Sequence, residues 1–273
     1  SKGIPLRRNF VVNFKFSALK ESMFEQSPHF HFEQLDSTNN YASTIAKLPE
    51  TRTGTAITAD FQLEGRGQRD NKWLAEAGSS FLGTLIIKVQ LNPEDIFFLS
   101  KWSALQVAKT LIQQNIHGVT IKWPNDIMSG NKKICGILNE LKIKGNEIKM
   151  IIIGFGLNIN QEDFENLPNA TSLKLLKGIN YDLNSLTMLF IENLNKYNYL
   201  DSLINLKSHN IETFFLRYKK NLFGVDKLYK FNMKHNTHFY GKIVSVDKEG
   251  IIKIKKDDHS FGHYNFDEIK MIY

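Results

Sequence analysis

The sequence predicts an α+β protein: a large domain built on a mixed β-sheet with flanking helices, followed by a small all-β module. Three observations lead to this class. Helix and strand patterns are interspersed up to about residue 222, short alternating runs dominate from Lys227 onward, and 273 residues suffice for one large domain with a small appendage. We therefore expect an N-terminal extension at 1–27, a main domain at 28–222 and a β module at 223–273.

The elements of the main domain follow from its local patterns. Residues 28–35 alternate in polarity as a strand does, and 36–39 are residues that favour the N-cap of the helix that follows, which ends at Pro49. The clearest helix begins at Asn92, where a cap residue, a proline and two acids precede apolar residues at helical spacing. Further strands are predicted at 54–60, 80–89, 119–123, 133–142 and 147–155, further helices at 183–206 and 209–220, and a hairpin in the β module at 241–255.

The composition limits the partners and the compartment. An excess of 35 Lys and Arg over 28 Asp and Glu gives a net charge of +7, which favours an anionic partner without choosing among nucleotides, nucleic acid, membranes and acidic proteins. The lone cysteine, Cys135, excludes an internal disulfide framework and fits a reducing compartment. No apolar run approaches the ~18 residues of a membrane span, and no apolar signal core is visible, so we expect a cytoplasmic protein.

Four polar stretches carry candidate chemistry. Residues 65–73 combine two glycines, which let the backbone approach an anion, with three basic side chains, although the spacing is not that of a Walker loop. Residues 122–126 place a lysine, an amide and a carboxylate directly after a strand, where they suit a phosphate, a base edge and Mg²⁺. The others are 131–138, in which lysines precede an apolar strand, and 154–160, which begins Gly-Phe-Gly.

Each stretch alone also has a structural interpretation. Residues 65–73 can be a solvated basic loop, 122–126 a turn that forms for backbone reasons, and 131–138 a strand that starts with solvated lysines. A lone Gly-x-Gly is weak evidence and lacks the spacing of a dinucleotide-binding loop. Cys135, among apolar neighbours, is expected to be a buried structural thiol.

Together and in this order, the stretches resemble the biotin protein ligases over about residues 30–272. The resemblance rests on Asp36-Ser37-Thr38-Asn39, on Gln62 ahead of Gly65-Arg66-Gly67 and Trp73, on Lys122 to Asp126, Lys133 to Leu138 and Gly154 to Asn158, and on Ala170 to Leu173 with Gly178. It implies a class II synthetase-like catalytic domain followed by an SH3-like barrel.

The implied activity is a two-step ligation. Biotin and MgATP give biotinyl-5′-AMP, from which biotin passes to a lysine of a biotin carboxyl carrier domain. Biotin, ATP and Mg²⁺ would thus be substrates and ligands, with no permanently bound cofactor. The partner would be the carrier domain of a biotin-dependent carboxylase, with no membrane partner, and the protein would be a monomer or a homodimer.

The resemblance also implies a role for individual residues. The implied catalytic side chains are Lys122, Lys133, Arg66 and Arg69. The implied biotin-binding residues are Ser37, Thr38, Asn39, Gln62, Gly65, Arg66, Gly67, Gln68, Lys133, Gly136, Gly154 and Gly156. The implied ATP and adenylate contacts are Arg66, Arg69, Lys72, Trp73, Lys122, Asn125, Asp126, Lys133 and Asn158, of which Asp126 is also the candidate Mg²⁺ ligand.

The sequence departs from the family pattern in the loop, which commonly reads G-R-G-R-x-G-R-x-W. Here Gln68, Asp70 and Asn71 replace the second Arg, the later Gly and the later Arg, so two phosphate-binding guanidiniums are missing. We hypothesise that Arg69, one residue displaced, takes over one of these roles. An Arg69→Ala variant that adenylated biotin at the parental rate would contradict this. Only about 35 residues precede Ser37, too few for the winged-helix domain of some members, so we expect no DNA binding.

Three alternatives remain open at this stage. A lipoate–protein ligase shares the fold and the adenylation chemistry, although Trp73 and the run 122–126 favour biotin. A non-catalytic nucleic-acid-binding protein would also explain the charge of +7, but it predicts basic and aromatic residues interleaved on one face. The loop substitutions could also mark a ligase that has lost activity.

Overall fold

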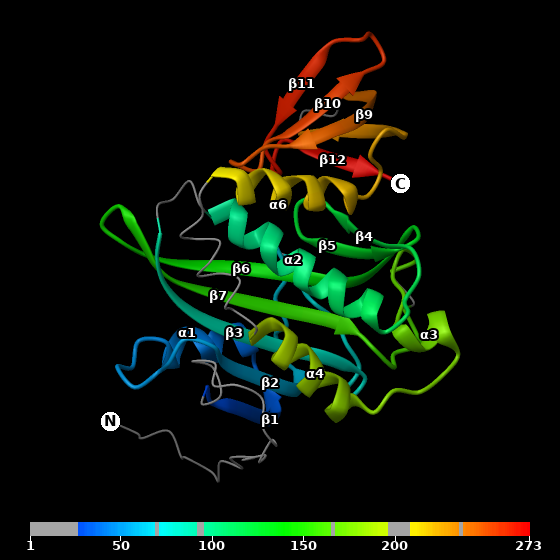
Figure 1. Ribbon diagram of the computed structural model, residues 1–273. Helices are drawn as coiled ribbons and strands as arrows, with labels where there is room; N and C mark the ends of the chain where they lie inside the picture. Colours follow the sequence, from blue (N-terminus) through cyan, green and yellow to red (C-terminus); the bar gives the residue numbers. More distant parts are fainter. Residues whose placement is uncertain (1–26, 69–70, 92–95, 165–166, 196–207, 235–236) are drawn as a thin grey trace.

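The computed structural model describes residues 27–273 except 69–70, 92–95, 165–166, 196–207 and 235–236 (Figure 1). All but the last residue of the predicted N-terminal extension therefore lie outside the described residues, as do the start predicted for the helix at Asn92 and the second half of the helix predicted at 183–206. No helix in the described part of the chain is both long and apolar enough to cross a membrane.

A seven-stranded mixed sheet forms the centre of the large domain, in the order β1-β2-β3-β7-β6-β5-β4. The β1–β2 pair is parallel and the other pairs are antiparallel. Together with the flanking helices this confirms the predicted fold class. The strands are β1 (His29–Leu35), β2 (Thr55–Gln62), β3 (Ser80–Leu91), β4 (Val119–Lys122), β5 (Asp126–Ser129), β6 (Lys132–Lys144) and β7 (Glu147–Asn158).

Helices cover both faces of this sheet. Alternate residues of each strand point to opposite faces, so a single strand contributes side chains to the packing on both sides. In β7, Ile152 packs under helix α1 (Thr38–Ile45), whereas Ile151 and Ile153 join the core on the other face. That second face carries α2 (Ile96–Gln113) and α4 (Leu183–Asn195), seen in front of the strands in Figure 1. The face under α1 matters most here, because the polar residues of the predicted site share it.

A second sheet, of five antiparallel strands in the order β11-β10-β9-β8-β12, follows the large domain. Helix α6 (Ser208–Lys220) lies between the two sheets in Figure 1, and its Phe214 ring packs against Phe98 of α2 at a centroid distance of 4.4 Å. The hairpin predicted at 241–255 is confirmed. The five strands are β8 (Leu228–Met233), β9 (His238–Val246), β10 (Ile252–Lys256), β11 (Phe261–Tyr264) and β12 (Ile269–Ile272).

Two short elements differ from the sequence prediction. The segment at 126–129 is strand β5, although the sequence suggested only a turn after Lys122, because it pairs with β4 on one side and β6 on the other. Residues Leu173–Lys177 form a short helix, α3, whose N-cap Ser172 accepts a hydrogen bond from the Leu175 N–H at 3.2 Å.

The turn between β9 and β10 holds the small sheet against the large domain. The Nζ of Lys101, from α2, donates to the backbone oxygen of Asp247, and the indole N–H of Trp123 donates to the oxygen of Gly250 at 3.0 Å. Gly250 has φ +87°, and a Cβ there would overlap the Phe97 ring. The domain contact therefore involves a lysine that is only 3% exposed.

We expect this lysine to give the protein a distinctive pH dependence. Burial lowers the pKa of Lys101 from 10.5 to about 8, against the opposing effects of Asp247 and Glu249. Below pH 8 the amine is charged in both states, and its burial costs about 3 kcal/mol. Between pH 8 and 10.5 the unfolded chain binds more protons, so this group makes the free energy of unfolding rise with pH.

Urea denaturation at pH 7.5, 8.5 and 9.5 checks this expectation. As pH rises, the free energy of unfolding of the parental protein should increase relative to that of Lys101→Met. Lys109→Met, at an exposed position of the same helix, is the control and should show no such trend. Parallel pH profiles for the parental protein and Lys101→Met would contradict the assignment.

Candidate active site

A row of cross-strand partners places the main polar groups side by side. Lys122 of β4 lies opposite Asp126 of β5, Asp126 lies opposite Gly136 of β6, and Gly136 lies opposite Gly156 of β7. Residues directly opposite in antiparallel strands project to the same face of the sheet. The four positions therefore form one line across the sheet.

Three glycines keep the floor of this face free of side chains. Gly154 and Gly156 alternate along β7 on the side of α1, and Gly136 is the neighbour of Gly156 in β6. A Cβ on Gly156 would overlap the Trp73 ring, and a Cβ on Gly136 would lie 2.9 Å from it. The indole of Trp73 thus lies directly on the backbone of the sheet, which only glycine permits.

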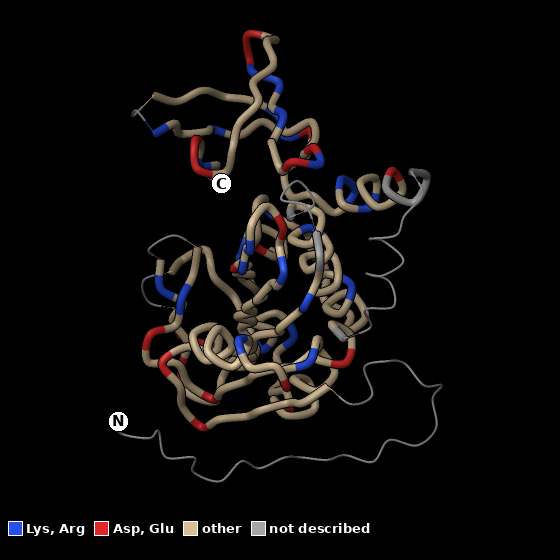
Figure 2. The backbone as a smooth tube through the Cα atoms, turned by 90° about the vertical axis from the view of Figure 1, so that its left-hand side faces the viewer, with Lys and Arg blue, Asp and Glu red and all other residues tan. Residues whose placement is uncertain are grey.

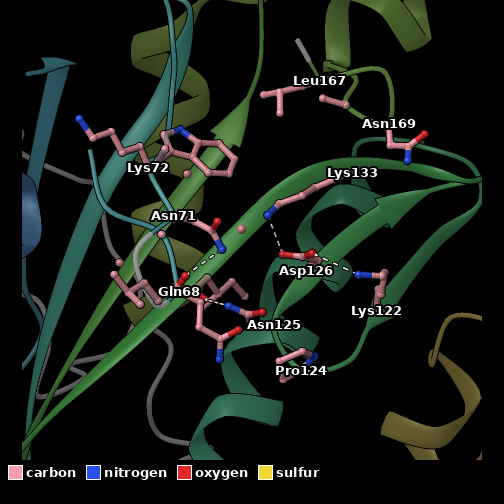
Figure 3. A pocket seen from close by; sticks show the side chains of 18 of the residues that line it. Gln68, Asn71, Lys72, Lys122, Pro124, Asn125, Asp126, Lys133, Leu167 and Asn169 are labelled. Carbon is pink, nitrogen blue, oxygen red and sulfur yellow. Dashed lines mark hydrogen bonds and ion pairs between the residues drawn. The ribbon is translucent and has the colours of Figure 1, made fainter. Parts of the chain in front are cut away.

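Asp126 lies between two lysines at one end of the row. Its carboxylate oxygens are 2.7 Å from Lys133 Nζ and 3.7 Å from Lys122 Nζ, and Figure 3 shows both amines directed at it. Burial lowers the pKa of Lys122, and nearby Lys133 and Lys270 add to this, whereas Asp126 opposes it. One carboxylate cannot neutralise two ammonium groups, so this end of the site has a net positive charge that suits phosphate oxygens.

The other end of the site, at the start of α1, is lined by hydroxyl and amide groups. The N–H and hydroxyl of Thr38 both donate to Gln62 Oε1, at 2.8 and 3.0 Å, and the Thr84 hydroxyl lies 2.6 Å from Asn39 Oδ1. Ser37 occupies the N-cap of α1, yet its side chain makes no capping hydrogen bond. A buried hydroxyl in the preferred capping position that does not cap is available to a ligand.

Residues 65–68 and 71–73 lie at the cavity and pair with each other through backbone hydrogen bonds. The Trp73 N–H donates to the Gly65 oxygen at 2.9 Å, and the Gly67 N–H donates to the Asn71 oxygen at 2.8 Å. Lys133 Nζ is 5.4 Å from the Trp73 ring, so the indole lies beside the charged end of the site.

The C-terminal sheet completes the cavity, whose volume is about 810 Å³. Lys270 and Met271 of β12 contribute side chains, and Lys122 Nζ lies 4.8 Å from the centre of the Tyr273 ring. Ligand sites usually measure roughly 300–1,000 Å³, so this cavity has room for a bound small molecule and a nucleotide together.

Nearly all the residues predicted from the sequence meet at this cavity. Gly65 is buried beside the cavity without lining it, and a Cβ there would overlap the Trp73 backbone oxygen, so its contact with biotin stays a prediction. Arg69 lies outside the described residues. The predicted residues that line the cavity are Ser37, Thr38, Asn39, Gln62, Arg66, Gly67, Gln68, Lys72, Trp73, Lys122, Asn125, Asp126, Lys133, Gly136, Gly154, Gly156 and Asn158.

Two residues that the resemblance implies as ATP or adenylate contacts, Asn125 and Asn158, already donate hydrogen bonds within the protein. The Asn125 amide donates to the Ile137 oxygen at 2.6 Å, and the Asn158 amide donates to the Thr171 oxygen at 3.0 Å. Asn158 is only 4% exposed. Both residues therefore also hold the walls of the cavity, a role that the sequence analysis did not assign.

The sequence analysis missed several residues at or beside the site. Thr84 and Asn169 lie in stretches without a recognisable motif, and Lys270 and Tyr273 come from the far end of the chain. Glu140 bonds to both Arg66 and Asn39. The sequence does indicate the position of Glu140, because it follows Gly136 by four residues in a predicted strand and therefore shares its face of β6.

A resident metal centre is not evident in the part of the chain that the structure describes. No group of three or more His, Cys, Asp or Glu side chains there is arranged to hold a metal ion. Asp126 is the only carboxylate among the described residues that line the cavity. This donor set does not suit an all-protein metal cage, but it fits Mg²⁺ that arrives with nucleotide phosphates.

A search against known families gives an independent assignment. The sequence profile described as "Biotin/lipoate A/B protein ligase family" matches residues 31–158, from β1 to the end of β7. Residues 31–158, slightly less than half of the chain, thus match this family. The resemblance found in the sequence is thereby confirmed, as is the expectation that the chain is an enzyme of the ligase class.

Curated ligases are similar over different lengths. The chain is 28% identical to "Bifunctional ligase/repressor BirA" of Bacillus subtilis, over 88% of this chain and 73% of that protein. It is 32% identical to the BirA of Escherichia coli, over 59% of this chain and 50% of that protein. It is 34% identical to "Biotin--[acetyl-CoA-carboxylase] ligase" of Paracoccus denitrificans, over 45% and 51%. The alignments thus span from about half to three quarters of these ligases.

Solved ligase structures have the same fold. The biotin protein ligase of Aquifex aeolicus, in complex with biotin and ATP, superimposes with a TM-score of 0.71 at 22% identity, over 89% of this chain and 98% of that one. The biotin protein ligase of Leishmania major, with biotin, gives 0.57 at 19% identity, over 86% and 97%. Both the mixed sheet with flanking helices and the second antiparallel sheet, consistent with an SH3-like domain, are thus those of the ligase family.

Proposed function

We propose that this chain is a biotin protein ligase. It activates biotin with MgATP to biotinyl-5′-AMP and then transfers biotin to a lysine of a biotin carboxyl carrier domain. The observation that carries the proposal is one cavity with hydroxyl and amide groups at the start of α1 and a Lys122–Asp126–Lys133 cluster at the other end. The names of the family relatives agree with this assignment.

The charged end suits the first step. When the biotin carboxylate approaches the α-phosphate of ATP, two anionic groups must come together, and fixed cations offset that repulsion. Lys133 would contact both groups, and this role is supported by its position, with Nζ 2.7 Å from Asp126 and 5.4 Å from the centre of the Trp73 ring. Lys122 reaches the same carboxylate from the opposite side and would stabilise charge on the phosphates.

Magnesium would enter as part of MgATP. Asp126 would hold it together with phosphate oxygens, as is usual for Mg²⁺ sites that have one or two protein carboxylates. The ion supplies charge neutralisation on the phosphates when it is bound. The two lysines hold the Asp126 carboxylate in place at the wall of the cavity.

The polar end suits the ureido ring of biotin, which presents one carbonyl oxygen and two N–H groups. The uncapped Ser37 hydroxyl can donate or accept, and the amides of Asn39 and Gln62 supply further donors and acceptors. Because the Ser37 hydroxyl is buried and makes no capping hydrogen bond, a ring without hydrogen-bonding atoms would leave it unsatisfied at a cost of about 1–3 kcal/mol.

This argument also separates biotin from lipoate. The dithiolane ring of lipoate offers no donor or strong acceptor to the start of α1, so the polar end disfavours it. A nucleic-acid-binding role is not supported, because Lys122 and Lys133 point into the cavity and the charges along the described chain are mixed in sign (Figure 2).

Two assays test the proposal. ATP–pyrophosphate exchange should depend on biotin and should be at least ~100-fold slower with lipoate at equal concentration. With biotin, MgATP and a carrier domain, mass spectrometry should show one added biotinyl group on the carrier. Exchange that depends on lipoate instead of biotin would favour the related activity, and an absence of exchange with either acid would refute both.

A further inference from the structure

The carboxylate of Glu140 bonds to both Arg66 and Asn39, two residues of the site that do not bond to each other directly. Its Oε1 accepts from Arg66 Nη2 at 2.8 Å, and its Oε2 accepts from Asn39 Nδ2 at 2.7 Å. Arg66 belongs to residues 65–68, at the cavity, whereas Asn39 lies at the polar end, in the first turn of α1. One side chain on β6 therefore holds both residues.

Both partners of Glu140 make further hydrogen bonds within the site. Arg66 also donates through Nη1 to Asn40 Oδ1 at 2.9 Å, and Asn40 in turn donates to Asp36 Oδ2 at 2.9 Å. Asn39 accepts from the Thr84 hydroxyl at 2.6 Å. The two terminal guanidinium nitrogens of Arg66 thus bond to Asn40 of α1 and to Glu140 of β6.

The position of Glu140 on the sheet explains why it reaches both partners. It lies opposite Ile152 of β7, which packs under α1, and therefore projects to the face that carries the cavity. Asn39 lies directly over Gly154, where a Cβ would overlap its Oδ1. Glu140 thus bonds to an amide that lies against the floor of the cavity.

We propose that Glu140 is a positioning residue that couples the place of Arg66 at the cavity to recognition of the biotin ring by Asn39. The inference rests on the proposed function. When a ring bonds to Asn39, the amide is held in the orientation in which its Nδ2–H fixes the Glu140 carboxylate for Arg66. An Arg66 that is bound to Glu140 favours the same orientation of Asn39, so the two contacts stabilise each other.

Replacing Glu140 should weaken biotin binding without changing the stability of the fold. The Arg66 and Glu140 side chains are 44% and 22% exposed, and half-exposed ion pairs contribute little to stability. A displaced Arg66 would nevertheless weaken binding of the molecule in the cavity. We expect Glu140→Gln to raise the KM for biotin about fivefold to tenfold while the KM for ATP and the melting temperature stay within experimental error.

The matched control is Glu147→Gln. Glu147 begins β7, near the tip of the β6–β7 hairpin, and its ion pair with Lys149 is away from the cavity. This variant should bind biotin as the parental protein does. Glu140→Asp keeps the charge but shortens the side chain, so it should behave like Glu140→Gln, because it cannot reach both partners.

A mutant cycle tests the coupling itself, with biotin alone as the probe in isothermal titration of the full chain. Arg66→Met and Asn39→Ser are measured singly and together, in the parental and Glu140→Gln backgrounds. In the parental background, the change in Kd of the double variant should differ by at least ~threefold from the product of the changes in the two single variants. In the Glu140→Gln background, the changes caused by Arg66→Met and Asn39→Ser should simply multiply.

Two results would overturn the inference. One is multiplicative effects in both backgrounds, and the other is a Glu140→Gln variant whose KM values for biotin and ATP rise equally, as they would for a merely structural residue. If the parental protein does not bind biotin at all, the proposed function fails instead, and the two failures are therefore distinguishable.

Discussion

Replacing Lys133 by alanine is expected to slow biotin-dependent ATP–pyrophosphate exchange by at least ~100-fold. Lys133 Nζ is 2.7 Å from Asp126 and lies beside the Trp73 ring, where the reacting carboxylate and phosphate would meet. Removing one preorganised group that stabilises transition-state charge typically costs about 10²–10³ in rate. Its loss also leaves the Asp126 carboxylate with Lys122 alone, at 3.7 Å, to face the incoming phosphates.

The sequence provides a matched control in the preceding residue. Lys132 is exposed and does not line the cavity, so Lys132→Ala should exchange pyrophosphate within twofold of the parental rate. Comparing the two variants separates a role in the reaction from a general effect of lowering the positive charge. Equal rates for Lys133→Ala and the parental protein would refute the proposed first step.

Adding a single methyl group at Gly154 is expected to raise the biotin Kd by about 10- to 100-fold. The new Cβ would overlap the Asn39 amide, which is 3% exposed and is held by Thr84 and Glu140. Because the amide cannot move without breaking those bonds, the strain falls on the polar end of the cavity. Overpacking of this kind costs about 1–3 kcal/mol, which corresponds to that range of affinity.

Titration calorimetry with biotin checks this effect, and Asn39→Ser provides the comparison. In the Asn39→Ser background the methyl group has no amide to displace, so Gly154→Ala should change the Kd by less than ~threefold. A similar loss of affinity in both backgrounds would show that the methyl acts through the sheet and not through Asn39. Thermal melting of each variant tests whether the fold is retained.

The sequence predicted the parts of this site that are local in the chain. Residues 65–73 and 122–126 are contiguous, so their chemistry could be recognised without knowing the fold, and both line the cavity. The helix predicted at 209–220 is α6, displaced by one residue, because its signals are local as well. Local signals also placed β1, β3, β6 and β7 near their observed bounds.

The features that depend on distant pairing could not be predicted. Strand β5 has only four residues and is fixed by hydrogen bonds to strands on both sides. Glu140 bonds to partners 74 and 101 residues away, so its role becomes visible only when the sheet brings them together. In the C-terminal sheet, β12 pairs with β8 across the length of the module, a contact that no local pattern encodes.

The row from Lys122 through Asp126 and Gly136 to Gly156 has a consequence for how the enzyme is made. A slip of one residue in the β5–β6 or β6–β7 pair would turn these groups to the opposite face, because side chains alternate with a period of two. Strand β7 has apolar side chains on both faces, Ile152 on one and Ile151 and Ile153 on the other, so a slipped strand would still bury apolar groups. A misregistered chain would therefore be inactive without being fully unfolded. Specific activity thus measures the fidelity of strand pairing in a preparation of this protein more sensitively than its secondary-structure content does.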